Sequence, residues 1–570
     1  MPSILYRVKP QTGLHISLLG MGLYRLLRKR LHTQYVTAAL ATTVFLISYA
    51  VLSGNGVSTQ RAVGMCLIYL FADVTGYAYD MLNALGIVVL VLLWKNPFLL
   101  SYSGFVFSVM AVIAIGVGAN VLLEWEHSWK RRQQAGEETI KKTFFSRQKE
   151  GILVSFAIQL FTIPLVAYSY YEIPVYAMLI NLFVLAVVNG LLGLTVLGVI
   201  VGMAFLPAGR VLFAPCGWML DSYRFLCEVS LKIPGAQRIT GKPAHMRIFW
   251  YYLGLGVFLL AIYACARRNE KHKDCRETAD LCVSRRKKRL QGIVFSCFIA
   301  FLLLFLLFPQ KKSFEIDFLD VGQGDGIYLC TGGGTSMFID GGSTDVKQVG
   351  KYRILPFLKA KGVSEISYWF VSHTDTDHVS GLKEVLVSGY RVEYLVFAKA
   401  VEKEAKTKEL AELARSHGTK VLYMQAGDTV RSKRAAMRCL YPKASDKAED
   451  VNDLCLVLQF EEGDISALFG GDISTDVEEQ LLRRRKWDKV LVFKADHHGS
   501  RYANAEALLK CIRPEITVAS AGKDNRYGHP SPDAVQRIKE SGSRFFCTIE
   551  GGRIRVRVIE NKLVCETYVK

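Results

Sequence analysis

A short segment in the second half of the chain carries four side chains that metal ions commonly bind. The segment FVSHTDTDHVSGL (370–382) holds imidazole and carboxylate groups within six residues, at His373, Asp375, Asp377 and His378. Nitrogen and oxygen ligands of this kind suit Zn²⁺ or Mn²⁺, whereas thiolates select softer metals. Taken alone, however, the two aspartates could equally be solvated loop residues or cap the helix that follows. The segment by itself leaves a metal site and a polar turn both open.

Two further apolar runs end in residues of the same kind. SALFGGDIS (466–474) ends near Asp472, and KVLVFKADHHGS (489–500) leads to His497 and His498. Because three predicted strands each deliver candidate ligands at a carboxyl end, we expect these ligands to converge on a site for two divalent ions. Two ions about 3.5–4 Å apart can stabilise the attacking and leaving oxygens of a phosphodiester together. A metal-bound water also becomes a hydroxide near neutral pH.

The elements that must position these residues follow from the pattern beyond residue 314. FEIDFLDVGQGDGIYLC predicts a strand, a glycine-rich turn and a second strand, and TSMFIDGG predicts another strand. ISYWFV (366–371) is a continuous apolar run typical of a buried strand, and VSGLKEVLVSG after the first ligand cluster is expected to be helical. This region has the composition of an ordinary soluble domain.

The first half of the chain has a different character. Residues 36 to about 309 carry long uncharged runs, and the last of them, LQGIVFSCFIAFLLLFLLFPQKK (290–312), is long enough to span a bilayer. A chain of 570 residues also exceeds the usual size of one core. We therefore expect a polytopic α-helical membrane domain over 1–309, with about eight or nine helices, and an α/β domain over 310–570.

Basic clusters between the apolar runs predict how the chain crosses the membrane. The clusters lie at 25–30, 130–149 and 266–289, and such clusters mark cytoplasmic loops. The net charge of +20 is therefore weak support for nucleic-acid binding. We count four crossings before the second cluster, three within 150–209, and two more that place the C-terminal domain outside the cell membrane. One crossing fewer in 175–209 is the alternative, and it would change the side on which that domain lies. The expected segments are 36–54, 61–79, 81–99, 101–122, 247–265 and 290–308, and 216–233 is expected to be an amphipathic helix at the outer interface.

Two other features limit the interpretation. The six cysteines beyond residue 310 have neither CxxC spacing nor a disulfide framework, so we expect buried free thiols. We identify no cleavable signal peptide at the start of the sequence. Few polar groups of the apolar half could line a pore, and the candidates are Asp73, Asn181 and Asn189.

The ligand motifs resemble those of the metallo-β-lactamase superfamily, whose fold is a four-layer αββα sandwich. HTDTDH, FGGDIS and ADHHGS correspond to its motifs, although the first is usually H-x-H-x-D-H and Asp375 here replaces the second histidine. The resemblance implies that one ion is held by His373 and Asp375 and the other by Asp377 and His378. It further implies a bridging Asp472 and a last ligand at either His497 or His498.

One expected ligand of that superfamily has no direct counterpart. A histidine normally lies about twenty residues before the bridging aspartate, whereas the chain reads VNDLCLVL there. Asn452 or Asp453 are the candidates to replace it, which leaves that ligand and the choice between Zn²⁺ and Mn²⁺ open.

A finer resemblance is to the ComEC family, membrane channels of natural DNA uptake. FLDVGQGDG, MFIDGG, KADHHGS and RYGHPSPDAV follow that family's order in the second half, and TGLHISLL, STQRAVGM and NPFLLSYSGFVFS do so in the first. The family implies a nuclease domain that degrades one DNA strand while the other passes through the channel. It implies catalytic roles for Asp377, Lys494 and His529, the last two at the scissile phosphate or leaving oxygen. It leaves supporting roles for Asp320, Asp325, Asp340 and Ser500, of which the first two are expected to shape the glycine-rich turn.

The resemblance also implies partners and leaves alternatives. Relatives work with a surface DNA receptor and a cytoplasmic ATP-driven motor of the helicase type. Full-length relatives carry further membrane segments and an OB-fold, a single-strand binding module, before the point where this sequence starts, so we expect both to be missing. The alternative functions are a membrane-anchored hydrolase of other surface phosphodiesters and a shortened remnant that is defective in transport.

Overall fold

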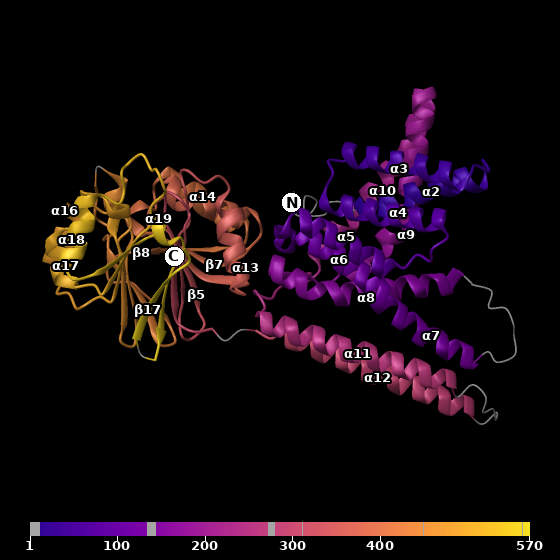
Figure 1. The fold of residues 1–570 in the computed structure, drawn as a ribbon. Helices are drawn as coiled ribbons and strands as arrows, with labels where there is room; N and C mark the ends of the chain where they lie inside the picture. Colours follow the sequence, from indigo (N-terminus) through magenta and orange to yellow (C-terminus); the bar gives the residue numbers. More distant parts are fainter. Residues whose placement is uncertain are drawn as a thin grey trace. The chain divides into compact units, whose positions relative to one another are not determined.

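The computed structural model describes residues 12–133, 144–271, 280–309, 312–448, 450–560 and 562–569. The chain divides into two compact units, Met1–Phe308 and Pro309–Lys570 (Figure 1). The first unit is helical, and the second is built on two large β-sheets covered by helices.

The helical unit is built of helices, several of them long and apolar. Uncharged runs of this length form helices because a helix satisfies every backbone polar group within the segment itself. Its long helices are α2 (Thr12–Lys29), α3 (Tyr35–Leu52), α4 (Val57–Thr75), α5 (Met81–Lys95), α6 (Ser103–Ile113), α7 (Asn120–Gln133), α8 (Phe144–Tyr170), α9 (Ala177–Ala204), α10 (Leu206–Lys232), α11 (His245–Lys271) and α12 (Asp280–Leu306). A π-helical turn, Ala114–Ala119, joins α6 to α7, and a small pair of strands, β1 (Glu172–Pro174) and β2 (Gln237–Ile239), lies in the connections that follow α8 and α10.

These helices pack in three apolar cores and one close helix pair. One core is shared by α2, α3 and α4, a second by α4, α5 and α6, and a third by α7, α8, α11 and α12. Helices α9 and α10 approach so closely that a Cβ on Gly209 would lie 2.5 Å from the Cα of Gly202. Small residues are what allow two helix backbones to touch in this way.

Within 150–209, where three crossings were predicted, the structure has helices α8 and α9 and the first residues of α10. The apolar run that was divided into two crossings is one uninterrupted helix of 28 residues. Within a helix, several glycines are tolerated when neighbouring helices support the backbone. The expected amphipathic segment 216–233 is the second part of α10, which carries Pro215 inside it.

Five helices, counted over the described residues alone, are long and apolar enough to cross a membrane. They are Tyr35–Leu52, Ser103–Trp129, Lys149–Tyr170, His245–Arg268 and Arg286–Leu306, and Met81–Lys95 and Gly190–Ala204 are shorter apolar helices. The helical unit is therefore that of a membrane protein. The number of crossings and the side of the membrane on which the second unit lies stay predictions.

The second unit contains two mixed β-sheets. Among the described residues, the first sheet holds eight strands in the order β17 (Lys562–Thr567), β16 (Ile554–Ile559), β3 (Glu315–Phe318), β4 (Gly326–Cys330), β5 (Ser336–Asp340), β6 (Glu365–Phe370), β7 (Arg391–Ala398) and β8 (Lys420–Met424). The second, over the same ranges, holds seven in the order β15 (Arg544–Cys547), β14 (Ile516–Ala519), β13 (Val492–Lys494), β12 (Ile465–Phe469), β11 (Val457–Glu462), β10 (Ala435–Tyr441) and β9 (Thr429–Ser432). Strands β5 to β8 are parallel, and so are β12 to β15.

The two sheets face one another across an apolar core, and helices cover their outer faces (Figure 1). Helices α13 (Leu355–Ala360), α14 (Thr376–Val387) and α15 (Ala405–Ser416) pack on the first sheet. Helices α16 (Thr475–Arg484), α17 (Glu506–Ile512) and α18 (Pro532–Glu540) pack on the second. The unit is therefore the expected four-layer αββα sandwich.

The cysteines of the sandwich are free thiols, as expected. Cys330, Cys439, Cys455 and Cys547 are buried and Cys565 is partly buried. Cys511 is exposed, so the prediction of burial is wrong at that position, which lies near the end of the surface helix α17.

Candidate metal centre

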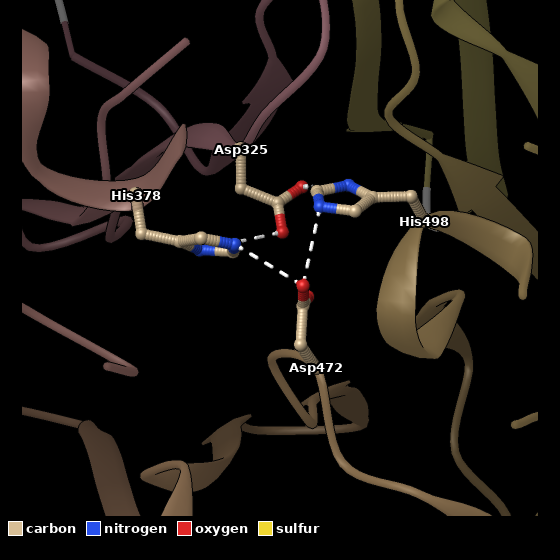
Figure 2. A group of neighbouring side chains, drawn as sticks. All are labelled: Asp325, His378, Asp472 and His498. Atoms are coloured by element: carbon tan, nitrogen blue, oxygen red, sulfur yellow. Dashed lines mark ion pairs between the residues drawn. The ribbon is translucent and has the colours of Figure 1, made fainter. Parts of the chain in front are cut away.

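Four buried side chains from separate parts of the sandwich meet at one point. They are Asp325, His378, Asp472 and His498, whose nearest ligand atoms all lie within 4.8 Å of one another (Figure 2). None of the four residues is more than 4% exposed. This set is called the four-residue cluster below.

The sandwich brings these residues together because its central strands end at the same edge. Asp472 follows β12, and His498 lies in the short helical turn Asp496–Gly499 after β13. His378 lies in the first turn of α14, just beyond the end of β6, and Asp325 ends the glycine-rich turn before β4. The carboxyl ends of parallel strands are a usual location for ligand sites in α/β proteins.

The spacing of the ligand atoms fits a single cation. Asp472 Oδ2 lies 3.3 Å from His378 Nε2 and 3.3 Å from His498 Nε2. Metal–ligand bonds of about 2.1 Å in tetrahedral geometry separate neighbouring ligand atoms by about 3.4 Å. The two histidine nitrogens and the shared carboxylate oxygen are therefore already at coordinating distances.

The hydrogen bonding of the cluster also fits a cation. His378 Nε2, His498 Nε2 and Asp472 Oδ1 are buried and have no hydrogen-bond partner among the described residues. Buried polar atoms without partners are uncommon, and an ion bound by Asp472 Oδ2 would satisfy the two histidine nitrogens. The donor set of imidazole nitrogen and carboxylate oxygen suits a divalent ion such as Zn²⁺ or Mn²⁺.

The outward-facing nitrogens of the two histidines are held by other groups. His378 Nδ1 lies 3.1 Å from Asp340 Oδ2, and His498 Nδ1 donates to the Ser520 carbonyl at 2.9 Å. Asp340 is itself fixed, since its Oδ1 accepts from the Ser372 amide at 2.7 Å. Such partners set the histidine tautomer and turn each Nε2 towards the metal position. Asp340 therefore lies beside the outer nitrogen of His378, and its supporting role stays a prediction.

The charges of the cluster hold its histidines in the protonated form when no cation is bound. Burial alone would lower the pKa of His498, but the carboxylates of Asp472 and Asp325 outweigh it and raise that pKa to about 9. The pKa of His378 is likewise raised, against its burial, by Asp472 and Asp340. The pKa of the Asp472 carboxyl is held low, against its burial, by the two histidines. A divalent ion would replace these protons.

The adjacent histidines of the HHGS motif are placed differently. Both have left-handed backbone conformations, with φ of 49° at His497 and 54° at His498. This turn buries His498 in the cluster, whereas the His497 side chain is 34% exposed and its Nε2 lies 4.0 Å from Asp472 Oδ2. The sequence left both histidines open as the last ligand, and the structure brings His498 into the four-residue cluster.

The other residues of the HTDTDH segment lie around the cluster. Asp377 Oδ2 is 3.7 Å from His498 Nε2, and the His373 ring packs 4.0 Å from the His378 ring. Asp375 is about half exposed, forms an ion pair with Lys406 at 2.9 Å and lies 4.0 Å from His373 Nε2. Ligand roles for His373, Asp375 and Asp377 stay predictions.

Two predicted catalytic side chains lie near the cluster. The ammonium of Lys494 is buried and lies 2.5 Å from Asp325 Oδ2 and 3.6 Å from Asp472 Oδ1. It also donates to the Gly471 carbonyl at 3.1 Å, so contact with a phosphate would require it to leave these partners. The His529 ring lies 6.3 Å from the His498 ring, and its Nδ1 is buried without a hydrogen-bond partner among the described residues.

The remaining predicted residues support the surrounding turns. Asp320 accepts from the Gly322 amide at 3.2 Å, which shapes the glycine-rich turn as expected. Ser500 accepts from the Tyr502 amide at 3.3 Å. Asp453 accepts from the Ser474 hydroxyl at 2.7 Å.

The missing superfamily histidine has no replacement within the four-residue cluster. Asp453 is not a member of that cluster and instead accepts a hydrogen bond from Ser474, whereas a ligand role for Asn452 stays a prediction. Cys455 is the nearby residue that the sequence analysis missed, since its Sγ lies 3.4 Å from His373 Nδ1.

Comparison with known proteins supports the resemblance inferred from the motifs. A family model described as "Competence protein" matches residues 12–264. "ComE operon protein 3" of Bacillus subtilis is 25% identical over 564 residues, which cover 96% of this chain and 67% of that protein. "Recombination protein 2" of Haemophilus influenzae is 24% identical over 591 residues, covering 97% of this chain and 68% of that protein. The chain spans about two thirds of the length of these relatives.

Solved structures are similar to the second unit at low identity. The metallo-β-lactamase fold protein YhfI from Bacillus subtilis is 11% identical, covering 43% of this chain and all of that one, with a TM-score of 0.31. The diiron β-hydroxylase CmlA from Streptomyces venezuelae is 14% identical, covering 47% of this chain and 59% of that one, with a TM-score of 0.31. The sandwich fold rests on the strand order and layers described above, and not on these values.

Proposed function

We propose that this chain, which belongs to the ComEC family of competence proteins, takes part in DNA uptake and that its sandwich unit is a metal-dependent hydrolase of DNA. The observation that carries the hydrolase is the four-residue cluster, with its buried histidine nitrogens and Asp472 oxygen unsatisfied. The match to competence proteins across both units supports DNA as the substrate.

The residues of the cluster would hold one divalent ion, which supplies Lewis-acid activation of a water and of the phosphate. Asp377 lies beside the cluster, and its pKa is lowered to about 2, against its burial, by the neighbouring His498 and by the charge of His378. It is therefore ionised at neutral pH and is placed to accept a hydrogen bond or proton from a water at the site. A second ion would be held by His373 and Asp375 with Asp472 shared, which gives the two-ion arrangement expected for phosphodiester hydrolysis.

The helical unit would form the membrane passage for the strand that is not degraded. Apolar helices of spanning length support a multi-pass arrangement, and the basic clusters in the sequence support a location of the sandwich outside the cytoplasm. In that arrangement double-stranded DNA is met outside and a single strand enters. A surface DNA receptor and a cytoplasmic ATP-driven motor would be its partners.

The hydrolase is tested with the full chain in detergent, loaded with Mn²⁺ or Zn²⁺ and given linear DNA. We expect cleavage by the wild type and its loss in Asp472→Asn, with bound metal falling together with activity. Asp317→Asn is the matched control, since Asp317 is also buried but pairs with Lys361 at 2.8 Å instead of lying in the cluster. Equal cleavage by wild type and Asp472→Asn would refute the assignment.

The uptake role is tested separately, by deleting the gene in a transformable host and restoring it with wild type or Asp472→Asn. Unchanged transformation after deletion would refute a role in uptake. Activity on small phosphodiesters without activity on polynucleotides would instead support the membrane-anchored hydrolase considered above.

A further inference from the structure

An exposed tyrosine stands at the end of a row of rings that begins in the metal centre. Tyr527 is 65% exposed, and its ring stacks on the His529 ring at 5.6 Å with the planes 24° apart. His529 in turn lies 6.3 Å from the His498 ring with the planes 27° apart. His498 belongs to the four-residue cluster, so the three rings lead from the cluster to the surface.

The loop that carries Tyr527 is held in shape by one asparagine. Asn525 Oδ1 accepts from the amides of Tyr527 at 3.2 Å and His529 at 2.9 Å. Its Nδ2 donates to the carbonyls of Gly522 at 2.9 Å and His529 at 2.5 Å. The tyrosine is therefore displayed by a loop with its own internal hydrogen bonds, which lowers the entropy lost when a ligand stacks on the ring.

The same loop presents positive charge. Lys523 and Arg526 are exposed, and neither forms an ion pair with any of the described residues. Asp524 is exposed beside them and offsets part of this charge. An aromatic ring flanked by unpaired cations is the usual composition of a surface that binds single-stranded nucleic acid by base stacking and phosphate contact.

We propose that Tyr527 is a stacking platform for one unpaired base of a single DNA strand, a more distant phosphate of which lies at the metal centre. This inference rests on the proposed hydrolase function and narrows its substrate to a single strand or a frayed duplex end. The physical reason is that both faces of a base inside a duplex are covered by neighbouring bases, so only an unstacked base can cover the Tyr527 ring. Lys523 and Arg526 would contact the phosphates on either side.

The proposal is tested by fluorescence anisotropy with the full chain in detergent, chelated so that no strand is cut. The probes are a ten-residue thymidylate strand and an abasic strand of the same length and charge. We expect the wild type to bind the thymidylate strand about tenfold more tightly than the abasic strand, since stacking on one aromatic ring has roughly this effect.

Three variants assign that difference to the ring. Tyr527→Ala should lose the preference for thymidylate while its affinity for the abasic strand is unchanged, and Tyr527→Phe should keep the preference. Tyr352→Ala is the matched control, because Tyr352 is 63% exposed but its ring faces Lys351 at 5.0 Å and no histidine. An equal affinity of Tyr527→Ala and wild type for thymidylate, or a loss that is the same for both strands, overturns the proposal.

The outcome can be separated from that of the hydrolase test. If the wild type cleaves DNA but Tyr527→Ala binds both strands as the wild type does, the hydrolase proposal is supported and the stacking proposal is refuted. If the preference for thymidylate depends on the Tyr527 ring but no DNA is cleaved, the stacking proposal is supported and the hydrolase proposal is refuted. With Mn²⁺ present, Tyr527→Ala should raise KM for thymidylate strands and leave hydrolysis of bis(p-nitrophenyl) phosphate, which has no base to stack, unchanged.

Discussion

The helical unit and the sandwich unit both contain polar side chains in their packed regions, but they arrange them in different ways. In the helical unit the polar contacts are isolated pairs that join two helices: the Tyr24 hydroxyl of α2 donates to Asp73 of α4, and Arg61 of α4 donates to Ser108 of α6 at 2.5 Å. In the sandwich, four buried ligand groups and the Lys494 ammonium lie together, and several of their atoms have no hydrogen-bond partner among the described residues.

This difference separates contacts that hold helices together from groups that await a ligand. A satisfied pair gains only a modest free energy and needs nothing further. A buried cluster with unsatisfied atoms is costly unless a cation completes it. We therefore expect the metal to matter for the stability of the sandwich and to be without effect on the helical unit, and the predictions below test that contrast.

Removing the metal should give the largest loss of thermal stability, and only the sandwich should lose it. A ligand at about 1,000 times its Kd stabilises the folded state by about 4 kcal/mol. For a unit of this size that corresponds to a fall in Tm of about 8–16 °C on chelation. Hydrogen exchange of peptides from each unit, followed with temperature, measures the two units separately. Asp472→Asn should make the sandwich insensitive to the chelator.

An equal fall in the melting temperatures of both units on chelation would contradict this contrast, because the helical unit has no described group of metal ligands. The same would follow if Asp472→Asn kept the chelator response of the wild type.

Two matched glycine-to-alanine substitutions, one in each unit, should each give an intermediate loss of stability. A Cβ on Gly342 would lie 2.4 Å from the backbone of Asp377 and His378, and one on Gly209 would lie 2.5 Å from Gly202. Each alanine overpacks a backbone contact and should cost about 1–3 kcal/mol. We expect Gly342→Ala also to weaken metal binding by about 10–100-fold, as changes next to metal ligands do.

The measurements for this pair are thermal melting and metal content by mass spectrometry. Gly209→Ala should lower the stability of the helical unit alone and leave metal content unchanged. Loss of metal in Gly209→Ala, or full metal affinity in Gly342→Ala, would contradict the separation of the two units.

The smallest effect is expected for Tyr24→Phe, which removes one hydroxyl that donates to Asp73. Loss of one hydrogen bond of this kind should cost about 1 kcal/mol. Thermal melting of the helical unit would show a small decrease, while DNA cleavage and metal content stay at wild-type values. A loss of cleavage in Tyr24→Phe would show that the two units are coupled more strongly than these contacts indicate.

Much of the candidate site followed from the sequence, because ligand residue types stood at the ends of apolar strands. His378 and Asp472 were identified in this way, and the αββα sandwich was expected from the same motifs. Asp325 was expected only to shape the glycine-rich turn, whereas it lies in the cluster and pairs with Lys494. An aspartate within DVGQGDG is typical of a turn. The direction of its side chain depends on how that turn folds against α14.

The helical unit was less predictable for a physical reason. Apolar runs identify helices, but an uninterrupted hydrophobic stretch gives no signal for where one crossing ends, and residues 177–204 form the single helix α9. The polar candidates were equally uncertain from sequence. Asp73 is paired with Tyr24 and Asn181 is exposed, whereas the side chain of Asn189 lies outside those described.

The sequence by itself determined which residue types the chain offers, the two kinds of domain, and the strands whose ends carry the ligands. Only the tertiary structure decided that His498 and not His497 enters the four-residue cluster, that Asp325 joins it, and that Lys494 is buried behind it. The reason is that neighbours in the chain can point in opposite directions, and the direction is set by backbone conformation and by packing between distant strands. For the two histidines, consecutive left-handed residues turn one ring inwards and leave the other at the surface.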